Sequence, residues 1–340
     1  MKYLITGGCG FLGSNIAAEI LRKGHELTII DNLSRDGAGD NLEWLRGQGQ
    51  FNFVADDVRS SEAVDSVIDG CKPHVVFHLA GQVAMTTSIR DPRKDFEINL
   101  LGSINVLEAI RRSSPKAVTI YSSTNKVYGD LTHFRCEEQA RRYVLPDYPA
   151  GVPETATLDF HSPYGCSKGG ADQYFLDYAR IFGLSTVVFR HSSMYGGRQF
   201  STADQGWIGW FCSQALLQSR GQGSEFTVSG DGKQVRDVLH AQDMVTLYLT
   251  AAEKHERLKG QAFNVGGGMA NSLSILELLD TLASMLSTKL AWRHIPARES
   301  DQRVFIADLS KVSAATGWSP QVDKETGIKL MLDWVANVLS

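Results

Sequence analysis

The chain has 340 residues, of which 43% are hydrophobic and 21% are charged, and its formal net charge is -4. This length accommodates one large domain or two unequal ones, and the composition is typical of globular proteins rather than of disordered chains. The small negative charge gives no broad cationic field for a polyanion, although a single anionic ligand needs only a local basic pocket. We therefore expect no nucleic-acid partner.

The cysteines and the apolar runs exclude several further classes of protein. The five cysteines are dispersed and form no C-x-x-C pair, so we expect neither a disulfide framework nor a metal site. The N-terminal apolar run is short and meets glycines at once, unlike a signal peptide. No apolar stretch approaches the length of a membrane span. These features predict a cytoplasmic protein without a membrane partner.

The first 190 residues alternate short apolar runs with helical patterns. Residues 3–6 form an apolar run that ends in glycines, residues 14–23 have helical periodicity, and residues 26–30 form a β-branched run. Strands that alternate with helices predict an α/β fold with a doubly wound parallel sheet, as in Rossmann-like domains. Further strands are predicted at 51–54, 74–79, 117–121 and 185–189, and further helices at 99–112 and 168–182.

After residue 190 the alternation loosens. A glycine-rich stretch covers residues 221–232, a lone apolar run covers 262–265, and helical patterns recur at 274–286 and 325–338. We interpret residues 1–190 as a dinucleotide-binding domain with an insertion near 130–157. Residues 191–340 would form mainly a smaller α/β substrate lobe, with interleaved boundaries. No Pro- or Ser-rich linker separates the two parts, so the lobe is expected to pack directly on the sheet.

Three glycines between the first predicted strand and helix indicate a dinucleotide site. Gly7 allows a tight turn, Gly10 lets the backbone approach a pyrophosphate, and Gly13 lets the helix pack on the strand. The helix N-terminus offers unpaired N–H groups to the phosphates. Asp31 ends the second strand, where a carboxylate accepts a hydrogen bond from the adenosine ribose and repels a 2′-phosphate. NAD is therefore preferred over NADP, although Arg35 nearby weakens this preference.

The spacing of these glycines resembles that of the extended short-chain dehydrogenase/reductase family, and the resemblance covers essentially the whole chain. Residues 55–58 resemble the adenine-contacting turn of the family, residues 78–82 its segment beneath the cofactor, and Asn99 the asparagine that orders the active site. The cofactor-binding residues implied by the glycine pattern and the resemblance are Gly7, Gly10, Phe11, Leu12, Gly13, Asp31, Asn32, Ser34, Arg35, Asp57, Val58, Leu79, Ala80, Gln82, Asn99, Ser122, Tyr164, Lys168 and His191.

Tyr164 and Lys168 have the Y-x-x-x-K spacing, which places both side chains on one face of a helix. A phenol has a reference pKa of about 10, and a nearby ammonium together with a positive nicotinamide ring is expected to lower the pKa of Tyr164. Such a pair alone is more often a solvated helix face, but the glycine pattern favours catalysis. The resemblance implies that Thr124 shares the substrate proton with Tyr164, and that Lys168 holds the nicotinamide ribose. Thr124, Tyr164 and Lys168 are thus the predicted catalytic residues.

The residues after Thr124 indicate the type of reaction. Sugar dehydratases of this family carry Asp and Glu where this chain has Asn125 and Lys126. Neither side chain can act as the carboxylate acid or base that loss of water requires. Epimerisation by reversible oxidation of one carbon is therefore favoured. The alternative is that positions 125 and 126 merely vary at a loop edge.

A nucleotide-sugar substrate requires cations for its diphosphate, and guanidinium groups match phosphate oxygens. Three arginines, Arg198, Arg236 and Arg298, lie in segments that resemble the ligand-facing segments of nucleotide-sugar epimerases, although each alone is more often a surface arginine. Asp237 is expected to support the lobe rather than the chemistry. The predicted substrate-binding residues are Thr124, Asn125, Lys126, Ser193, Arg198, Gln199, Arg236, Arg298 and Asp301.

The closest resemblance is to the CDP-tyvelose 2-epimerase (CDP-paratose 2-epimerase) group, and it rests on residues 122–130, 158–168 and 189–199. It implies an NAD-dependent inversion at C2 of a CDP-hexose through a transient 2-keto intermediate. A nucleotide-sugar 4-epimerase is an alternative, but residues 191–193 differ from the Tyr-Phe-Asn usual in such enzymes. An NAD-dependent sugar dehydrogenase is a second alternative. A non-catalytic dinucleotide sensor is a third, although a sensor has no use for a catalytic base.

Two further features leave choices open. The insertion is basic around Arg141 and Arg142, and it either shapes the sugar pocket or forms a solvated loop. The predicted helices at 99–112 and 168–182 resemble the pair that forms a dimer bundle in this family. We therefore expect a homodimer or homotetramer.

Overall fold

A computed structural model describes residues 1–297 and 301–339 of the chain. Its main sheet has seven strands in the order β3-β2-β1-β4-β5-β8-β12, and every neighbouring pair is parallel. The predicted doubly wound parallel sheet is thereby confirmed. The strands are β1 (Lys2–Thr6), β2 (Glu26–Ile30), β3 (Asn52–Val54), β4 (Val75–His78), β5 (Val118–Thr124), β8 (Ser185–His191) and β12 (Gln261–Val265).

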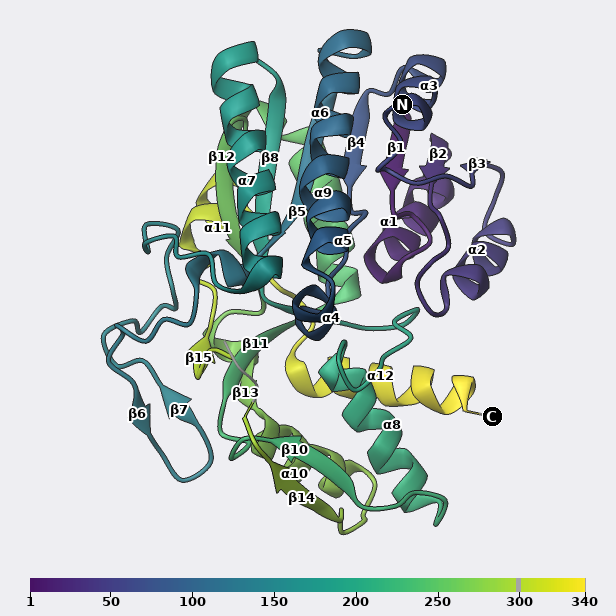
Figure 1. Ribbon diagram of the computed structural model, residues 1–340. Helices are drawn as coiled ribbons and strands as arrows, with labels where there is room; N and C mark the ends of the chain where they lie inside the picture. Colours follow the sequence, from purple (N-terminus) through teal and green to yellow (C-terminus); the bar gives the residue numbers. More distant parts are fainter. Residues whose placement is uncertain (298–300, 340) are drawn as a thin grey trace.

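Helices cover both faces of this sheet, as Figure 1 shows. Alternate residues along each strand enter opposite cores: Ile5 and Phe77 face one core, while Leu4 and Val76 face the other. This period of two is that of a strand buried on both sides. The first core is covered by α1 (Phe11–Arg22), α2 (Ala38–Arg46), α9 (Ala241–Glu253) and α11 (Ser310–Thr316), and the second by α3 (Ser61–Cys71), α6 (Gly102–Ser113) and α7 (Ser162–Phe182).

The apolar run at residues 262–265 belongs to the main sheet, so its assignment to the substrate lobe is wrong. As β12 it pairs with β8 at the sheet edge, and its side chains reach both cores, with Phe263 in one and Ala262 in the other. The preceding helix α9 packs against α1. A short apolar run does not indicate to which sheet its strand belongs. The position of this run after the start of the lobe was therefore misleading, because the chain returns here from the lobe to the main sheet.

The lobe lies beyond the carboxyl ends of the main strands (Figure 1). Its central strand β11 pairs with β9 and β15 in parallel and with β13 in antiparallel orientation. Helices α8 and α12 pack together over an apolar core of their own. The lobe consists of β9 (Ser193–Tyr195), α8 (Trp207–Ser219), β10 (Phe226–Ser229), β11 (Val235–His240), β13 (Ser272–Ser274), α10 (Ile275–Met285), β14 (Trp292–Ile295), β15 (Val304–Phe305) and α12 (Lys324–Val338).

The insertion has many exposed residues but is not a free loop, and its residues do not line the cleft at the strand ends. Its hairpin, β6 (Glu137–Glu138) and β7 (Tyr143–Val144), is fastened to the lobe. Arg142 donates to the Ser272 hydroxyl at 2.7 Å, and Arg141 pairs with Asp280 on α10. The two arginines thus bind a hydroxyl and a carboxylate of the lobe. The sequence alone does not reveal these partners.

Short helical segments complete the description. Helices α4 (Met85–Arg90) and α5 (Pro92–Phe96) lead into a π-helical turn (Glu97–Leu101) before α6, and a 3-10 turn (Asn125–Tyr128) follows β5. Two more 3-10 turns cover His255–Arg257 and Met269–Asn271. Over residues 1–297 and 301–339, no helix has the length and apolarity to cross a bilayer. In the same residues, no cluster of three or more His, Cys, Asp or Glu side chains is arranged to hold a metal ion.

Candidate active site

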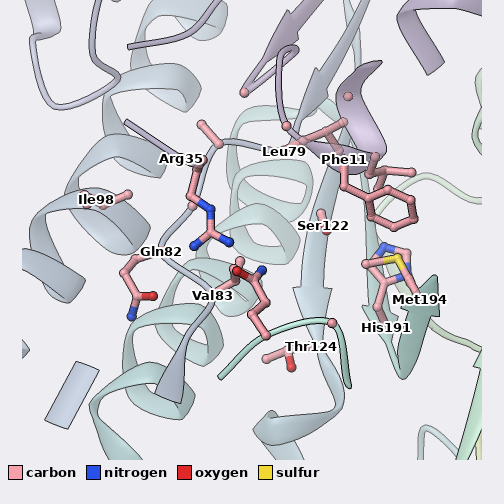
Figure 2. Close-up of a pocket in the computed structure, with 18 of the residues that line it drawn as sticks. Phe11, Arg35, Leu79, Gln82, Val83, Ile98, Ser122, Thr124, His191 and Met194 are labelled. Atoms are coloured by element: carbon pink, nitrogen blue, oxygen red, sulfur yellow. The ribbon is translucent and has the colours of Figure 1, made fainter. Parts of the chain in front are cut away.

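A cleft of about 570 Å³ lies at the carboxyl ends of the main strands, where it is lined by both the sheet and the lobe. Ligands of open α/β sheets bind at this edge. Figure 2 shows side chains from five parts of the chain, Phe11, Arg35, Gln82, Thr124 and His191, around one space. All predicted cofactor-binding residues line it except Asn99, as do all predicted substrate-binding residues except Arg298, which lies outside the described residues.

The glycine turn between β1 and α1 leaves backbone exposed to this cleft. Gly7 has a φ of +71°, and a Cβ on Gly13 would lie 2.3 Å from the Gly7 carbonyl oxygen. A Cβ on Gly10 would meet only that same oxygen, at 3.3 Å, so the backbone is open to a ligand there. Helix α1 has no side-chain cap at its N-terminus. The first N–H groups of α1 are therefore available to an anion in the cleft.

Asp31 is fixed beside this turn by the backbone. The Cys9 N–H donates to one carboxylate oxygen at 2.9 Å, and the Leu33 N–H donates to the other at 2.8 Å. Each oxygen keeps a lone pair for a further donor such as a ribose hydroxyl. Burial raises the pKa of Asp31. Arg35 extends into the same cleft (Figure 2).

We expect Asp31→Ala to weaken the binding of NAD much more than that of NADP. The substitution removes the acceptor for the ribose hydroxyl and also the charge that repels a 2′-phosphate, while Arg35 remains. Calorimetric titration with both dinucleotides measures this difference. Equal weakening of both would show that Asp31 does not face the ribose.

Thr124 and Tyr164 meet at the bottom of the cleft. Thr124 ends β5, and Tyr164 lies in the first turn of α7, which begins six residues earlier than the predicted Lys168 start. The Thr124 hydroxyl hydrogen-bonds to the phenol of Tyr164. Lys168 lies one turn further along α7, donates to the Ser122 carbonyl at 2.5 Å and lies 4.3 Å from the Tyr121 ring centroid. The three predicted catalytic side chains thus converge on one strand end.

Burial determines the charge of these groups. It raises the pKa of Tyr164 to about 12, with the Thr124 hydrogen bond opposing this rise. Burial also lowers the pKa of Lys168 to about 7, against the influence of Asp95 and Asp172. Burial thus opposes the expected lowering of the Tyr164 pKa, and the expectation, which includes a positive nicotinamide ring, stays a prediction for the protein with bound cofactor. The loss of hydration disfavours the phenolate, and the Asp95 carboxylate acts in the same direction.

Asn125 and Lys126 are both held by the lobe. The Asn125 amide donates to the buried Gln302 at 2.8 Å, and the Lys126 ammonium lies 3.4 Å from the Asp301 carboxylate. The same carboxylate accepts from Arg236 at 2.6 Å. These contacts place both side chains against the lobe rather than at a free loop edge.

Arg198 lies at the seam between the sheet domain and the lobe. Its guanidinium carbon is 4.9 Å from the ring centroid of Trp44 on α2, and 6.0 Å from those of Phe200 and Trp334. Cation–π contacts of this kind fix a guanidinium. Arg198 still lines the cleft, and its role toward a diphosphate stays a prediction.

Several cleft residues were not predicted from the sequence. Trp207 opens α8 and donates its indole N–H to Ser193 at 3.1 Å, but α8 is apolar on most sides, so its periodicity does not single out Trp207. His191 was predicted, and its Nδ1 has no partner among the described residues. The unpredicted lining residues include Val83, Met85, Lys94, Ile98, Met194, Phe200, Gln205 and Trp207.

Comparison with known proteins identifies the family. Residues 3–266 match the model of the NAD dependent epimerase/dehydratase family. The chain belongs to this family. It is 56% identical over 338 residues to the CDP-paratose 2-epimerase of Salmonella typhi, and the match covers 99% of this chain and 100% of that protein.

Solved structures of the family share the fold over the full length. The UDP-glucose 4-epimerase of Thermotoga maritima, solved with UDP-glucose, superposes with a TM-score of 0.85 at 28% identity and covers 100% of both chains. The UDP-glucose 4-epimerase of Thermus thermophilus, solved with NAD, has a TM-score of 0.81 at 27% identity and covers 99% of both chains. The open backbone at Gly10, the free lone pairs of Asp31 and the unpartnered His191 nitrogen fit the cofactor after which the family is named.

Proposed function

We propose that this chain is an NAD-dependent epimerase that inverts C2 of a CDP-linked hexose of the paratose and tyvelose type. The observation that carries the proposal is the 56% identity, from end to end, with the Salmonella typhi CDP-paratose 2-epimerase. Two features of the cleft support it. Thr124, Tyr164 and Lys168 converge there, and Asn125 and Lys126 stand where a dehydratase needs carboxylates.

In this proposal Tyr164 acts as the general base toward the C2 hydroxyl. Thr124, which hydrogen-bonds to Tyr164, orients that hydroxyl and shares its proton. The glycine turn, Asp31 and Lys168 would hold NAD, which would supply the hydride acceptor and donor for the sugar carbon. Tyr164 then donates the proton back to the oxygen of the 2-keto sugar, now turned to its other face. No net oxidation results, which separates this reaction from that of a sugar dehydrogenase.

The cofactor would be held by groups that the sequence singled out. The glycine turn and the start of α1 offer N–H donors to a pyrophosphate, Asp31 accepts from the adenosine ribose, and Lys168 binds the nicotinamide ribose. His191 has a buried acceptor or donor nitrogen at the wall of the cleft.

Inversion requires that the sugar turn while the rest of the substrate stays fixed. This requirement is met by firm contacts to the diphosphate and few contacts to the sugar ring. Arg236 and Arg198 would provide the contacts to the diphosphate. The Asp301 carboxylate, 2.6 Å from Arg236, holds that guanidinium in the cleft wall. Arg298 would complete the set.

We also propose a homodimer or homotetramer formed through the helices near the active site. Apolar side chains are exposed along α5, the π-helical turn and α7, namely Phe96, Leu101, Tyr174, Ile181 and Phe182. Exposed apolar groups gathered on adjacent elements favour association. Equilibrium sedimentation of the wild type and of Ile181→Lys tests this, and a wild-type monomer would contradict it.

Incubation with CDP-paratose in deuterium oxide, followed by NMR of the sugar protons, tests the function. We expect conversion at C2 without solvent deuterium at that carbon, because the hydrogen travels as hydride. UDP-glucose in a parallel sample is the control for the 4-epimerase alternative. Deuterium at C2 would indicate removal of a carbon-bound proton, and inversion at C4 would move the enzyme to the other branch of the family.

A further inference from the structure

The helix that carries Tyr164 and Lys168 contacts a buried carboxylate for which the proposed reaction has no use. Asp95 on α5 has 1% of its surface exposed. One of its oxygens accepts from the Ser167 hydroxyl at 2.5 Å, and the other accepts from the Gln82 amide at 2.8 Å. These donors are neutral, although an ionised carboxylate is costly to bury. Ser167 immediately precedes Lys168, so the carboxylate holds the turn between the two catalytic side chains.

Asn99 extends this contact to the wall of the cleft. Its amide nitrogen lies 3.2 Å from Asp95 and 3.0 Å from the Ser167 hydroxyl, while its oxygen accepts from the Gln82 N–H at 2.8 Å. A Cβ on Gly81 would lie 3.1 Å from the Asn99 oxygen and 3.7 Å from the Lys168 ammonium. The network and the ammonium therefore pack against the same glycine.

Two buried carboxylates, Asp95 and Asp172, raise the pKa of Lys168, and they differ in their partners. Asp172 on α7 is bound by both ends of the Arg190 guanidinium at 2.9 Å, so its charge is largely neutralised. Asp95 has no such ion pair among the described residues. The other titratable groups that face Lys168 are Tyr121 on β5, Tyr164 on α7, His78 on β4 and His191 on β8. Burial lowers the pKa of both histidines to about 3, so both are neutral near pH 7.

We propose that Asp95 is a positioning residue for the catalytic pair, whose buried carboxylate fixes Ser167 in the turn between Tyr164 and Lys168 and favours the ammonium form of Lys168. The pKa of Lys168 agrees in direction, since burial lowers it to about 7 and Asp95 opposes that fall. Burial raises the pKa of Asp95 in turn, and the hydrogen bond from Ser167 opposes that rise. Without Asp95 the amine would lose its proton at lower pH. Asp95 also raises the pKa of Tyr164, so the effect of Asp95 on the catalytic pair is measured on Lys168 itself. The inference rests on the proposed function for the roles of Tyr164 and Lys168 only.

NMR titration of protein with ¹³C- and ¹⁵N-labelled lysine measures the ionisation of Lys168 without any substrate. The Lys168 signal is assigned by its loss in Lys168→Arg. We expect Asp95→Asn, which keeps the size of the side chain, to lower the midpoint by roughly one pH unit. Ser103→Ala is the matched control, because it removes hydrogen bonds to His78 and to the Asn99 carbonyl in the same network without changing charge. A Lys168 midpoint in Asp95→Asn equal to that of the wild type overturns the proposal.

A second variant keeps the test decisive if Asp95→Asn does not fold. The Ser167 hydrogen bond favours the ionised form of Asp95, so Ser167→Ala raises the pKa of Asp95 and should lower the Lys168 midpoint by less, in the same direction. With turnover as readout, the alkaline limb of the kcat profile moves to lower pH in Asp95→Asn but not in Ser103→Ala. An equal loss of kcat at every pH would assign Asp95 a structural role and overturn the proposal. Absence of CDP-paratose turnover would refute the proposed function while leaving the NMR titration valid.

Discussion

Tyr164→Phe is expected to lower kcat about a thousandfold, which lies within the range that a general base contributes. The phenylalanine ring fills the same buried space, because only the hydroxyl that hydrogen-bonds to Thr124 is lost. The fold and the affinity for NAD should therefore stay close to those of the wild type. Steady-state turnover, calorimetric NAD binding and thermal unfolding measure the three properties separately.

Tyr178→Phe is the matched control for this change. Tyr178 lies on the same helix, is similarly buried, and donates its hydroxyl hydrogen bond to Glu108 at 2.8 Å, but it does not line the cleft. Its loss should affect stability slightly and turnover hardly at all. If Tyr164→Phe retained turnover within about tenfold of the wild type, Tyr164 would not be the base.

The sequence predicted the parts of the site that local chemistry encodes. The glycines, Asp31 and the Y-x-x-x-K pair are residue types that a dinucleotide site and its chemistry require at fixed spacings. The fold brings all of them to one cleft. The strands of the main sheet were predicted within a few residues, because continuous apolar runs report burial directly. The strands of the lobe and of the insertion were not predicted. Strand β5 extends to Thr124, beyond the predicted end at residue 121, since polar side chains at a strand end carry no apolar signal.

What the sequence could not provide are contacts between distant segments. Gln302 reaches Asn125, and the insertion reaches α10, because the lobe folds over the strand ends, and no periodic pattern records such a contact. The sequence does not reveal the burial of the Tyr164 phenol for the same reason. The Tyr164 pKa was expected to fall, but it depends on how completely the lobe and the helices exclude water from the phenol.

Arg190→Met should destabilise the protein by about 3–5 kcal/mol, the usual effect of leaving one buried charge without its partner. Asp172 and Arg190 have 0% and 5% of their side chains exposed and form a bidentate pair. Ser123, next to the catalytic Thr124, donates to the same carboxylate at 2.8 Å. The pair thus anchors the end of β5, and turnover should fall together with stability. Urea unfolding measures the change.

An exposed ion pair on α7, the helix that carries Asp172, provides the control. Arg180 and Asp177 have 77% and 41% of their side chains exposed, so Arg180→Met should change the free energy of unfolding by less than about 1 kcal/mol. The double variant Arg190→Met with Asp172→Leu should recover part of the loss, because it removes both charges from the apolar surroundings. A double variant less stable than Arg190→Met alone would contradict this. The loss of stability would then come from packing and from the hydrogen bonds of the Ser123 and Tyr128 hydroxyls rather than from the unpaired carboxylate. The ion pair would not be what anchors the catalytic strand.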